Sequence, residues 1–466
     1  MNVLVVGKGP KNSEIISYFE KRGNYVCEKE SSDINGLKGC IGSFNVKLAE
    51  GLTGTDVVIL AEVPKACASD IDGGKVHSIY DEDKMSFLPK KEKLDPVVFL
   101  LDYFDDSQIA AHITALNDAK KLACQKRKTY YISRFVRTAC PGGEKLYKEA
   151  RNSGVNFIKF EEINISYDLD EDRFTFDVND GVISKEISTK TVFTEDSRDT
   201  GDVYKNVTRA LRITTDENGL INEDRHFLTS ALTSRTGVYH INRNVAIVGL
   251  EDALDSIAND IAAIEYEAAY GECGEKVIVD GEKCVFCYSC YRACPHAAME
   301  PDLDSRVMEN LTASCHSCGI CVSVCPGNAL ELAETDEVFA FEKKKKILVM
   351  CCENSAEIAI EKTLPALGND ASLIDVQSIS CGGQVGLENI SEALTAYEKV
   401  MIAVCMDDAC KHFDGNKRAC AQSDRLKEML EKSGLDAGRV GYAKVSPVMP
   451  GVLKDEIKAF MKGELA

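Results

Sequence analysis

The chain has 466 residues, of which 44% are apolar, and its formal net charge is −20. This length exceeds one ordinary domain and predicts about two to four domains. The excess of acidic side chains argues against a broad phosphate-binding surface, so nucleic acid is not an expected partner. No apolar run reaches the roughly 18 residues that cross a bilayer, and the N-terminus does not resemble a signal peptide. We therefore expect a cytoplasmic protein.

Cysteines are unusually numerous, with 20 in the chain. In a reducing compartment a disulfide framework is not expected, so metal ligation is the better interpretation. Their distribution also divides the chain. Residues 1–250 alternate expected strands and helices, residues 251–340 concentrate nine cysteines, and residues 341–466 alternate strand and helix again. We expect three domains with these boundaries and an α/β fold class overall, with an α+β ferredoxin domain inserted in the middle.

The first domain is expected to begin with a dinucleotide-binding turn. A buried strand at residues 3–6 leads into Gly7 and Gly9, and Glu28 follows near the place of a ribose-binding acid. Asn12 stands where a third glycine would allow close packing of helix on strand. We therefore predict a degenerate flavin or dinucleotide site, with Gly7, Gly9 and Glu28 as candidate residues for binding FAD. A scaffold that has lost its flavin is the alternative.

A repeated cysteine run is the strongest signal in the sequence. The second copy begins 31 residues after the first, and each copy has three cysteines at two-residue intervals followed by Cys-Pro. In two-cluster ferredoxins the first three cysteines of a run hold one cubane and the fourth holds the other. A zinc site would have no use for the third cysteine. We predict two 4Fe-4S clusters, one held by Cys284, Cys287, Cys290 and Cys325, and the other by Cys315, Cys318, Cys321 and Cys294.

Cysteines also follow the expected strands of the last domain. Those strands end near residues 350, 379 and 404. Because the carboxyl ends of parallel strands share one edge, the thiols are expected to meet there and to hold a 2Fe-2S cluster. Buried free thiols, which pack as small apolar groups, are the alternative. The candidate ligands are Cys351, Cys381, Cys405 and Cys410, with Cys352 as the alternative to Cys351.

With these motifs, the chain resembles the A-type subunit of heterodisulfide reductase, and in particular the related B-type component of quinone-interacting membrane-bound oxidoreductase. The resemblance rests on the ferredoxin run, on the segment from Arg134 to Ile158, and on the C-terminal part. That last part resembles the delta subunit of methyl-viologen-reducing hydrogenase, which carries a 2Fe-2S cluster in the family. Asn354 stands where this domain often has a further cysteine.

The resemblance implies an iron–sulfur electron-transfer subunit of a cytoplasmic multi-subunit redox complex. The implied partners are other redox subunits of the heterodisulfide-reductase, flavoprotein or hydrogenase type, with indirect membrane contact through a quinone-reactive subunit. We expect the contact at the strand-end edge of the last domain or at the ferredoxin face near Cys315. A flavin-dependent oxidoreductase with its own substrate site at FAD is the alternative function, and a scaffold stabilised by its clusters is a third.

Overall fold

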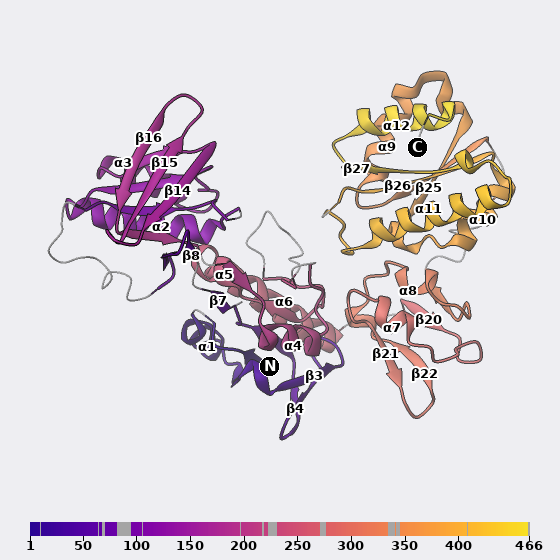
Figure 1. Cartoon of the computed structure of the whole chain (residues 1–466). Coiled ribbons are helices and arrows are strands. Elements are labelled where there is room, and N and C mark those ends of the chain that lie inside the picture. Colours follow the sequence, from indigo (N-terminus) through magenta and orange to yellow (C-terminus); the bar gives the residue numbers. More distant parts are fainter. Residues whose placement is uncertain are drawn as a thin grey trace.

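The computed structural model has a mixed α/β fold, which confirms the predicted fold class (Figure 1). Its helices and strands form two parallel sheets in the N-terminal half, a small ferredoxin unit, and a third parallel sheet at the C-terminus. None of the helices in the described part of the chain has the length and apolar content of a membrane-spanning segment. The described residues are 1–9, 11–63, 65–67, 70–81, 95–104, 106–195, 197–216, 219–221, 231–270, 276–333, 341, 345–407 and 409–464.

The first sheet has four parallel strands in the order β19-β6-β1-β2. Helix α6 packs on this sheet, because Ala253 and Ile257 share a buried core with Val3 and Val5. A boundary drawn by packing therefore falls after α6, whereas the sequence placed it at residue 250. The elements of this unit are β1 (Asn2–Val6), α1 (Asn12–Glu20), β2 (Tyr25–Lys29), β3 (Ile34–Lys38), β4 (Phe44–Leu48), β5 (Gly51–Thr55), β6 (Val57–Leu60), α4 (Asp202–Leu211), β19 (Val238–His240), α5 (Arg243–Val248) and α6 (Leu250–Tyr270).

The chain between β6 and β19 builds a second parallel sheet, in the order β10-β17-β11-β12-β13. Alternate residues of β11 point to opposite faces: Phe99 packs with α2, and Val98 packs with the antiparallel strands β14 to β16. The region expected as one domain thus holds two sheets. The elements are β7 (Lys65–Cys67), β8 (Asp70–Ile71), β9 (Gly74–Lys75), β10 (His77–Ser78), β11 (Val97–Leu100), α2 (Ile109–Cys124), β12 (Thr129–Ser133), α3 (Gly143–Asn152), β13 (Asn156–Lys159), β14 (Glu162–Asp168), β15 (Arg173–Asn179), β16 (Ser184–Thr189), β17 (Thr191–Thr194) and β18 (Ser197–Asp199).

The ferredoxin unit repeats one short pattern twice. Each cysteine run enters a short helix and is followed by a strand, and antiparallel pairing joins β20 to β23 and β21 to β22. This arrangement matches the repeat seen in the sequence. The elements are β20 (Val277–Val279), α7 (Ser289–Ala293), β21 (Met299–Asp302), β22 (Val307–Asn310), α8 (Ile320–Ser323) and β23 (Leu330–Leu332).

The C-terminal unit is the small parallel α/β domain predicted from the sequence, with strand order β25-β24-β26-β27. Its central strands are apolar and buried on both faces, as expected for a parallel sheet covered by helices. The elements are β24 (Ile347–Cys352), α9 (Ala356–Leu367), β25 (Ile374–Ile379), α10 (Leu387–Ala396), β26 (Lys399–Cys405), α11 (Gly415–Lys432), β27 (Val440–Val445) and α12 (Pro450–Lys462).

Arg235 joins the first unit to the ferredoxin unit. Its side chain is fully buried, and its guanidinium donates to the carbonyl oxygens of Leu37 (3.2 Å), Leu211 (2.9 Å) and Gly39 (2.8 Å). Glu300 of β21 lies 4.0 Å from the same group. Burial lowers the pKa of Arg235 to about 10, which still leaves it charged at neutral pH. One buried cation therefore satisfies backbone acceptors of the first unit and faces a carboxylate of the next.

We predict that Arg235→Met lowers the free energy of unfolding by about 3 kcal/mol, because buried acceptors lose their donor and Glu300 loses a cation. Arg209→Met, at an exposed position of α4, is the matched control and should change little. Thermal unfolding followed by circular dichroism measures both. Equal midpoints for the two variants would contradict the role given to Arg235.

Candidate functional site: three cavities lined by cysteine

The first cavity, called here the outer cavity, is lined by one predicted set of ligands: Cys284, Cys287, Cys290 and Cys325. Cys287 is exposed, and its hydrogen bond with Ser289 lowers its pKa. Cys290 is buried, and burial raises its pKa to about 11. Without a metal, the buried thiol of this set would be protonated at neutral pH, whereas ligation removes the proton.

The second cavity, called the inner cavity, is lined by the other predicted set: Cys294, Cys315, Cys318 and Cys321. Three of these four cysteines are buried. Burial raises the pKa of Cys318 to about 12 and that of Cys321 well above its usual value. Each fourth cysteine accepts a backbone N–H bond from four residues further on, Cys294 from Ala298 and Cys325 from Ala329, both at 3.3 Å. Such donors stabilise thiolate ligands.

The two cysteine loops share an unusual backbone. Phe286 and Ser317 occupy matching places in the two runs and have φ of 53° and 51°. Tyr288 and Gly319 also match, with φ of 62° and 71°. Non-glycine residues rarely adopt this left-handed conformation, and at Tyr288 the tight loop requires it. The alternation turns successive thiols toward one point, so eight cysteines form two four-thiol sets that fit two cubanes.

The third cavity, called the C-terminal cavity, lies at the strand-end edge of the last sheet and is lined by Cys352, Cys381, Cys405 and Cys410. The sulfur of Cys352 is 3.5 Å from that of Cys405. Contact with Cys410 raises the pKa of Cys381, and contact with Cys352 raises the pKa of Cys405. Contact with Cys381 and Cys405 lowers the pKa of Cys410. These mutual contacts bring four thiols within reach of one small metal centre.

The expected choice of Cys351 over Cys352 is not the one that the structure supports. Both residues lie in β24 and both are buried, but Cys352 lines the cavity and Cys351 does not. Successive side chains of a strand point to opposite faces, so only one of two adjacent cysteines can face the other three. Asn354, which stands in place of a further cysteine, also lines the cavity.

The inner and C-terminal cavities are neighbours. Cys318 and Cys381 belong to one buried cluster with Ile320. The hydroxyl of Ser323 in α8 donates to the carbonyl of Gly383 at 2.7 Å, which fixes the ferredoxin unit on the edge of the last sheet. The inner cavity, rather than the outer one, therefore faces the C-terminal cavity.

Histidines that the sequence analysis did not single out stand at this junction. Nδ1 of His296 lies 2.9 Å from the carbonyl of Ser234 and carries the proton, because a carbonyl only accepts. Its Nε2 lies 3.0 Å from Nδ1 of His412, and its ring stacks on His316 at 4.0 Å. Burial lowers the pKa of His296 to about 3 and that of His412 to about 4. The one signal in the sequence was their position, within two residues of a cluster cysteine.

The N-terminal turn brings two of its three predicted residues into one hydrogen-bonded group. Nδ2 of Asn12 donates to the carbonyl of Gly7 (2.7 Å) and to Oε1 of Glu28 (2.9 Å). Gly9 lies against β6, where a Cβ would come within 2.3 Å of the Ala61 carbonyl. The second glycine is thus required by packing of the turn on its own sheet.

The residues of this turn do not fit the pyrophosphate of FAD. Oε2 of Glu62 accepts from the hydroxyl of Ser31 at 2.6 Å and would lie 2.7 Å from a Cβ built at Gly7. A carboxylate therefore occupies the space beside the turn, where a phosphate needs N–H donors and positive potential. Glu28, the expected ribose-binding acid, is already bonded to Asn12.

Comparison with known proteins gives a family match for each of the two cysteine-rich regions. The family described as 4Fe-4S dicluster domain matches residues 271–330, and the family described as methyl-viologen-reducing hydrogenase, delta subunit, matches residues 347–464. Over 53 residues the chain is 40% identical to pyruvate synthase subunit PorD of Methanocaldococcus jannaschii, which is 11% of this chain and 60% of that protein. Over 57 residues it is 35% identical to an uncharacterized ferredoxin of the same organism, which is 12% of this chain and 74% of that protein.

Solved structures with a similar backbone include thioredoxin reductases. Thioredoxin reductase of Lactococcus lactis aligns with 57% of this chain and 99% of its own, at 13% identity and a TM-score of 0.38. That of T. acidophilum aligns with 57% and 98%, at 14% identity and a TM-score of 0.37.

Fold, cavities and comparisons together define an iron–sulfur electron-transfer protein with a two-cluster ferredoxin domain and a domain like the hydrogenase delta subunit. Through its ferredoxin domain, the chain belongs to the 4Fe-4S dicluster ferredoxin family. The chain spans 60% of the length of the first curated relative.

We predict that Cys352→Ala removes the iron of the C-terminal centre, about two atoms per chain for a 2Fe-2S cluster, whereas Cys351→Ala retains it. The two changes are chemically identical and one residue apart, so each serves as the control of the other. Iron and acid-labile sulfide would be measured after anaerobic purification. Loss of iron from Cys351→Ala alone would restore the choice made from the sequence.

Proposed function

We propose that this chain is the iron–sulfur relay subunit of a multi-subunit redox complex, with three centres in a row. The outer cubane would use Cys284, Cys287, Cys290 and Cys325, and the inner cubane Cys294, Cys315, Cys318 and Cys321. A 2Fe-2S cluster would use Cys352, Cys381, Cys405 and Cys410. The observation that carries this proposal is the shared buried cluster of Cys318 and Cys381, which joins the inner and C-terminal cavities.

The order of the centres follows from which thiols are buried and which are exposed. The inner cavity lies between the other two, because Cys318 shares a buried cluster with Cys381 of the last domain, while Cys321 shares another with Cys290 of the outer set. The outer set includes Cys287, the exposed cysteine among the eight ferredoxin ligands. Electrons would enter or leave at this exposed end and would move through the inner cubane to or from the C-terminal cluster. Either direction of flow uses the same order of centres.

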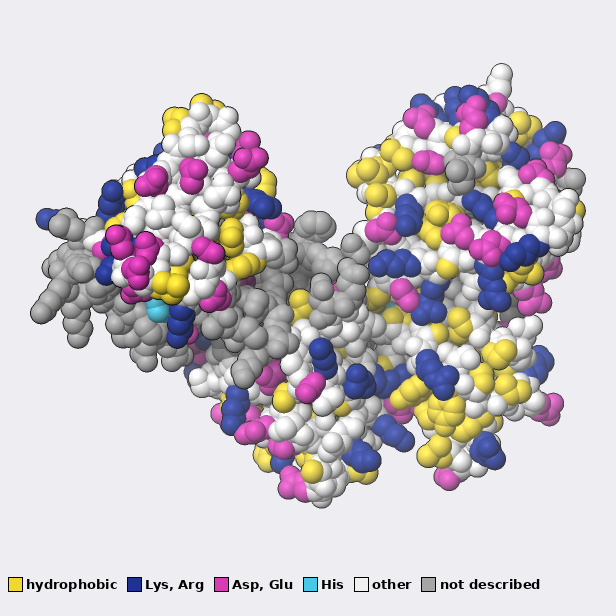
Figure 2. Space-filling view, in the orientation of Figure 1, with side chains coloured by type: hydrophobic (Ala, Val, Ile, Leu, Met, Phe, Trp, Pro, Cys, Tyr) yellow, Lys and Arg dark blue, Asp and Glu magenta, His cyan; other side chains and the backbone are white. Residues whose placement is uncertain are grey.

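The contact with a redox partner is best placed at the outer cubane. The contact expected near Cys315 would lie at a buried residue, and the strand-end edge of the last domain is covered by the ferredoxin unit. Val285, beside Cys287, is 67% exposed, and apolar side chains gather on the visible face of this unit (Figure 2). An exposed apolar side chain beside a cavity lined by cysteine suits contact with a transient redox partner.

The relatives' names support assembly with further redox subunits, since one names a hydrogenase delta subunit and the other names a pyruvate synthase component. We place the chain in a complex of the heterodisulfide-reductase or quinone-interacting oxidoreductase type, on the resemblance of its motifs. A membrane contact would then be made by a quinone-reactive partner. The rival function, a flavin-dependent oxidoreductase, lacks support, because Glu62 lies beside the turn that would hold FAD.

We predict that Cys321→Ala removes or converts the inner cubane and stops reduction of the C-terminal cluster through the outer one. Cys420→Ala is the control, because Cys420 is buried but lines none of the three cavities. Electron paramagnetic resonance after reduction by a low-potential ferredoxin measures each centre. Unchanged spectra and full iron in the Cys321 variant would refute the assignment, and clusters that no reductant changes would favour the scaffold.

A second prediction concerns the outer face. Val285→Asp places a charge at this exposed apolar position and should slow reduction by an external ferredoxin about tenfold, at unchanged iron content. Leu169→Asp is the control, since Leu169 is 81% exposed on the turn after β14, away from the ferredoxin unit. Stopped-flow absorbance at several donor concentrations gives the second-order rate constant. Equal slowing by both variants would mean that the effect is one of net charge.

A further inference from the structure

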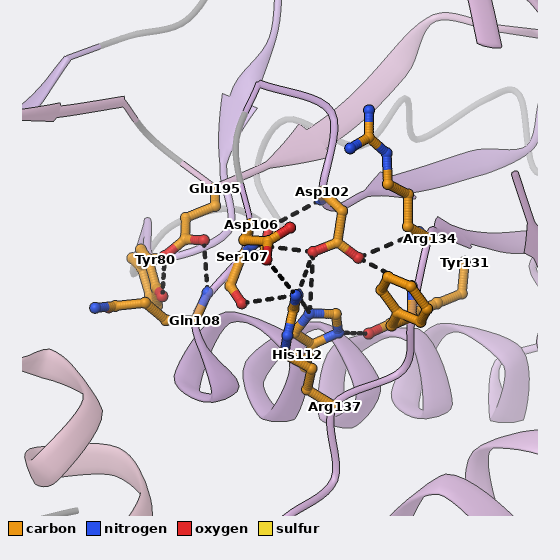
Figure 3. A network of polar contacts seen from close by, with 11 residues as sticks. Tyr80, Asp102, Asp106, Ser107, Gln108, His112, Tyr131, Arg134, Arg137 and Glu195 are labelled. Atoms are coloured by element: carbon orange, nitrogen blue, oxygen red, sulfur yellow. Dashed lines mark hydrogen bonds and ion pairs between the residues drawn. The ribbon is translucent and has the colours of Figure 1, made fainter. Parts of the chain in front are cut away.

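The carboxyl edge of the second sheet is filled where a nucleotide phosphate would bind (Figure 3). In a dinucleotide-binding fold, phosphates bind the free N–H groups at the start of the helix that follows the first strand. Here that helix is α2, and N–H groups at its start already have acceptors. Oε2 of Glu195 accepts from the Gln108 N–H at 3.0 Å, and Oδ1 of Asn244 accepts from the Ala110 N–H at 2.9 Å.

The turn between β11 and α2 is built around a carboxylate of the chain itself. Asp102 is 1% exposed, and its Oδ1 accepts from the Ser107 N–H at 2.9 Å and from the guanidinium of Arg137 at 2.5 Å. Its other oxygen accepts from the N–H groups of Arg134 and Phe135, each at 3.2 Å. Burial opposes ionisation, but these bonds and the contact with His112 outweigh it and hold the pKa of Asp102 below its usual value.

The sequence of this turn agrees with the geometry. Residues 101–107 contain three aspartates and no glycine, whereas a phosphate-binding turn needs glycines so that the backbone can approach the ligand. Asp102 itself adopts φ of 59°, in the left-handed region where a glycine would be expected. The network in Figure 3 thus gives the turn an internal anion, and the guanidinium of Arg137 is already paired with it.

The first sheet shows the same solution with different residues. Glu62, which follows β6, lies beside Gly7 and is held by Ser31. Asn12 occupies the start of α1 and binds Glu28. Two sheets of one chain therefore have a carboxylate from a neighbouring strand end at the place where a bound nucleotide would need its phosphate. Because both sheets have a carboxylate at this position, the arrangement is better explained as a feature of the fold than as one local substitution.

We infer that both nucleotide-type edges of the N-terminal half are filled by the chain's own carboxylates, and that this half therefore binds neither a flavin nor a nicotinamide nucleotide. This inference rests on the proposed relay function and limits its chemistry. A hydride carries two electrons and a proton, whereas each cluster accepts one electron with no bond made or broken. Splitting a hydride into single electrons needs a two-electron carrier such as a flavin. A partner that draws its electrons from a hydride donor must therefore hold that carrier itself and deliver the electrons to this chain one at a time.

The inference is tested first on the full chain purified anaerobically. We expect no flavin in the extracted protein, full bleaching of the iron–sulfur absorbance by dithionite, and no bleaching by NADH or NADPH. Stoichiometric flavin, or bleaching by a nicotinamide nucleotide, would overturn the inference while leaving the relay intact. Absence of iron, or clusters that dithionite does not reduce, would instead overturn the proposed function.

The blocking residues are tested by opening the first edge. The double variant Asn12→Gly with Glu62→Gln removes the side chain at the third-glycine position and the charge beside Gly7. It should raise the affinity for added FAD about tenfold or more, measured by quenching of flavin fluorescence. The control is Asn24→Gly with Glu20→Gln, the same two changes in the last residue of α1 and in the loop that follows it, which should leave FAD binding unchanged.

Folding of the variants is checked by iron content and circular dichroism. If the double variant does not fold, Glu62→Gln alone removes the charge and should raise FAD affinity by a smaller factor. Equal affinity in wild type, folded variant and control would overturn the role of Glu62 and Asn12. A rise in the control as large as in the variant would show that net charge, not the filled turn, excludes the nucleotide.

Discussion

The rest of the structure depends on sets of buried cysteines whose thiolates need the positive charge of a bound metal. Cys318 and Cys321 have pKa values raised by burial, and a four-thiolate set in an interior without metal would be strongly unfavourable. Ligation removes the protons and supplies the positive charge, so cluster binding and folding are coupled. Little else stabilises the ferredoxin unit, since its strands are three or four residues long.

The same grouping explains how the last domain sits on the ferredoxin unit. Its strand-end edge carries four cysteines and would otherwise face water, but α8 covers it through the bond from Ser323 to Gly383. The neutral pair His296 and His412 fills the junction without adding charge between the cysteines of the inner and C-terminal cavities. The cysteines of the two cavities are thus held close together by fixed contacts.

The N-terminal half contributes support. Arg235 ties it to β21, and Ser234 accepts from His296, so the larger part of the chain holds the ferredoxin unit in place. Its two sheets keep the parallel topology of nucleotide-binding folds, while Glu62 and Glu195 fill the edges. A chain can have this fold without a cofactor site, because the apolar core stabilises the sheet, whereas the phosphate site depends on a few residues of two turns.

The spacing of cysteines determined the two ferredoxin sets, because three ligands two residues apart belong to one tight loop whose geometry is local. Apolar runs likewise determined the α/β class and the C-terminal sheet, since a parallel strand buried on both faces is typically a continuous run of apolar residues. Tertiary structure alone decided that Cys352 rather than Cys351 faces the cavity, because a strand buried on both faces gives no polar alternation from which its phase can be read. It also decided which of the two ferredoxin cavities meets the last domain and that Glu62 and Glu195 fill the nucleotide-type edges. Those contacts join residues far apart in the chain, and no local pattern records them.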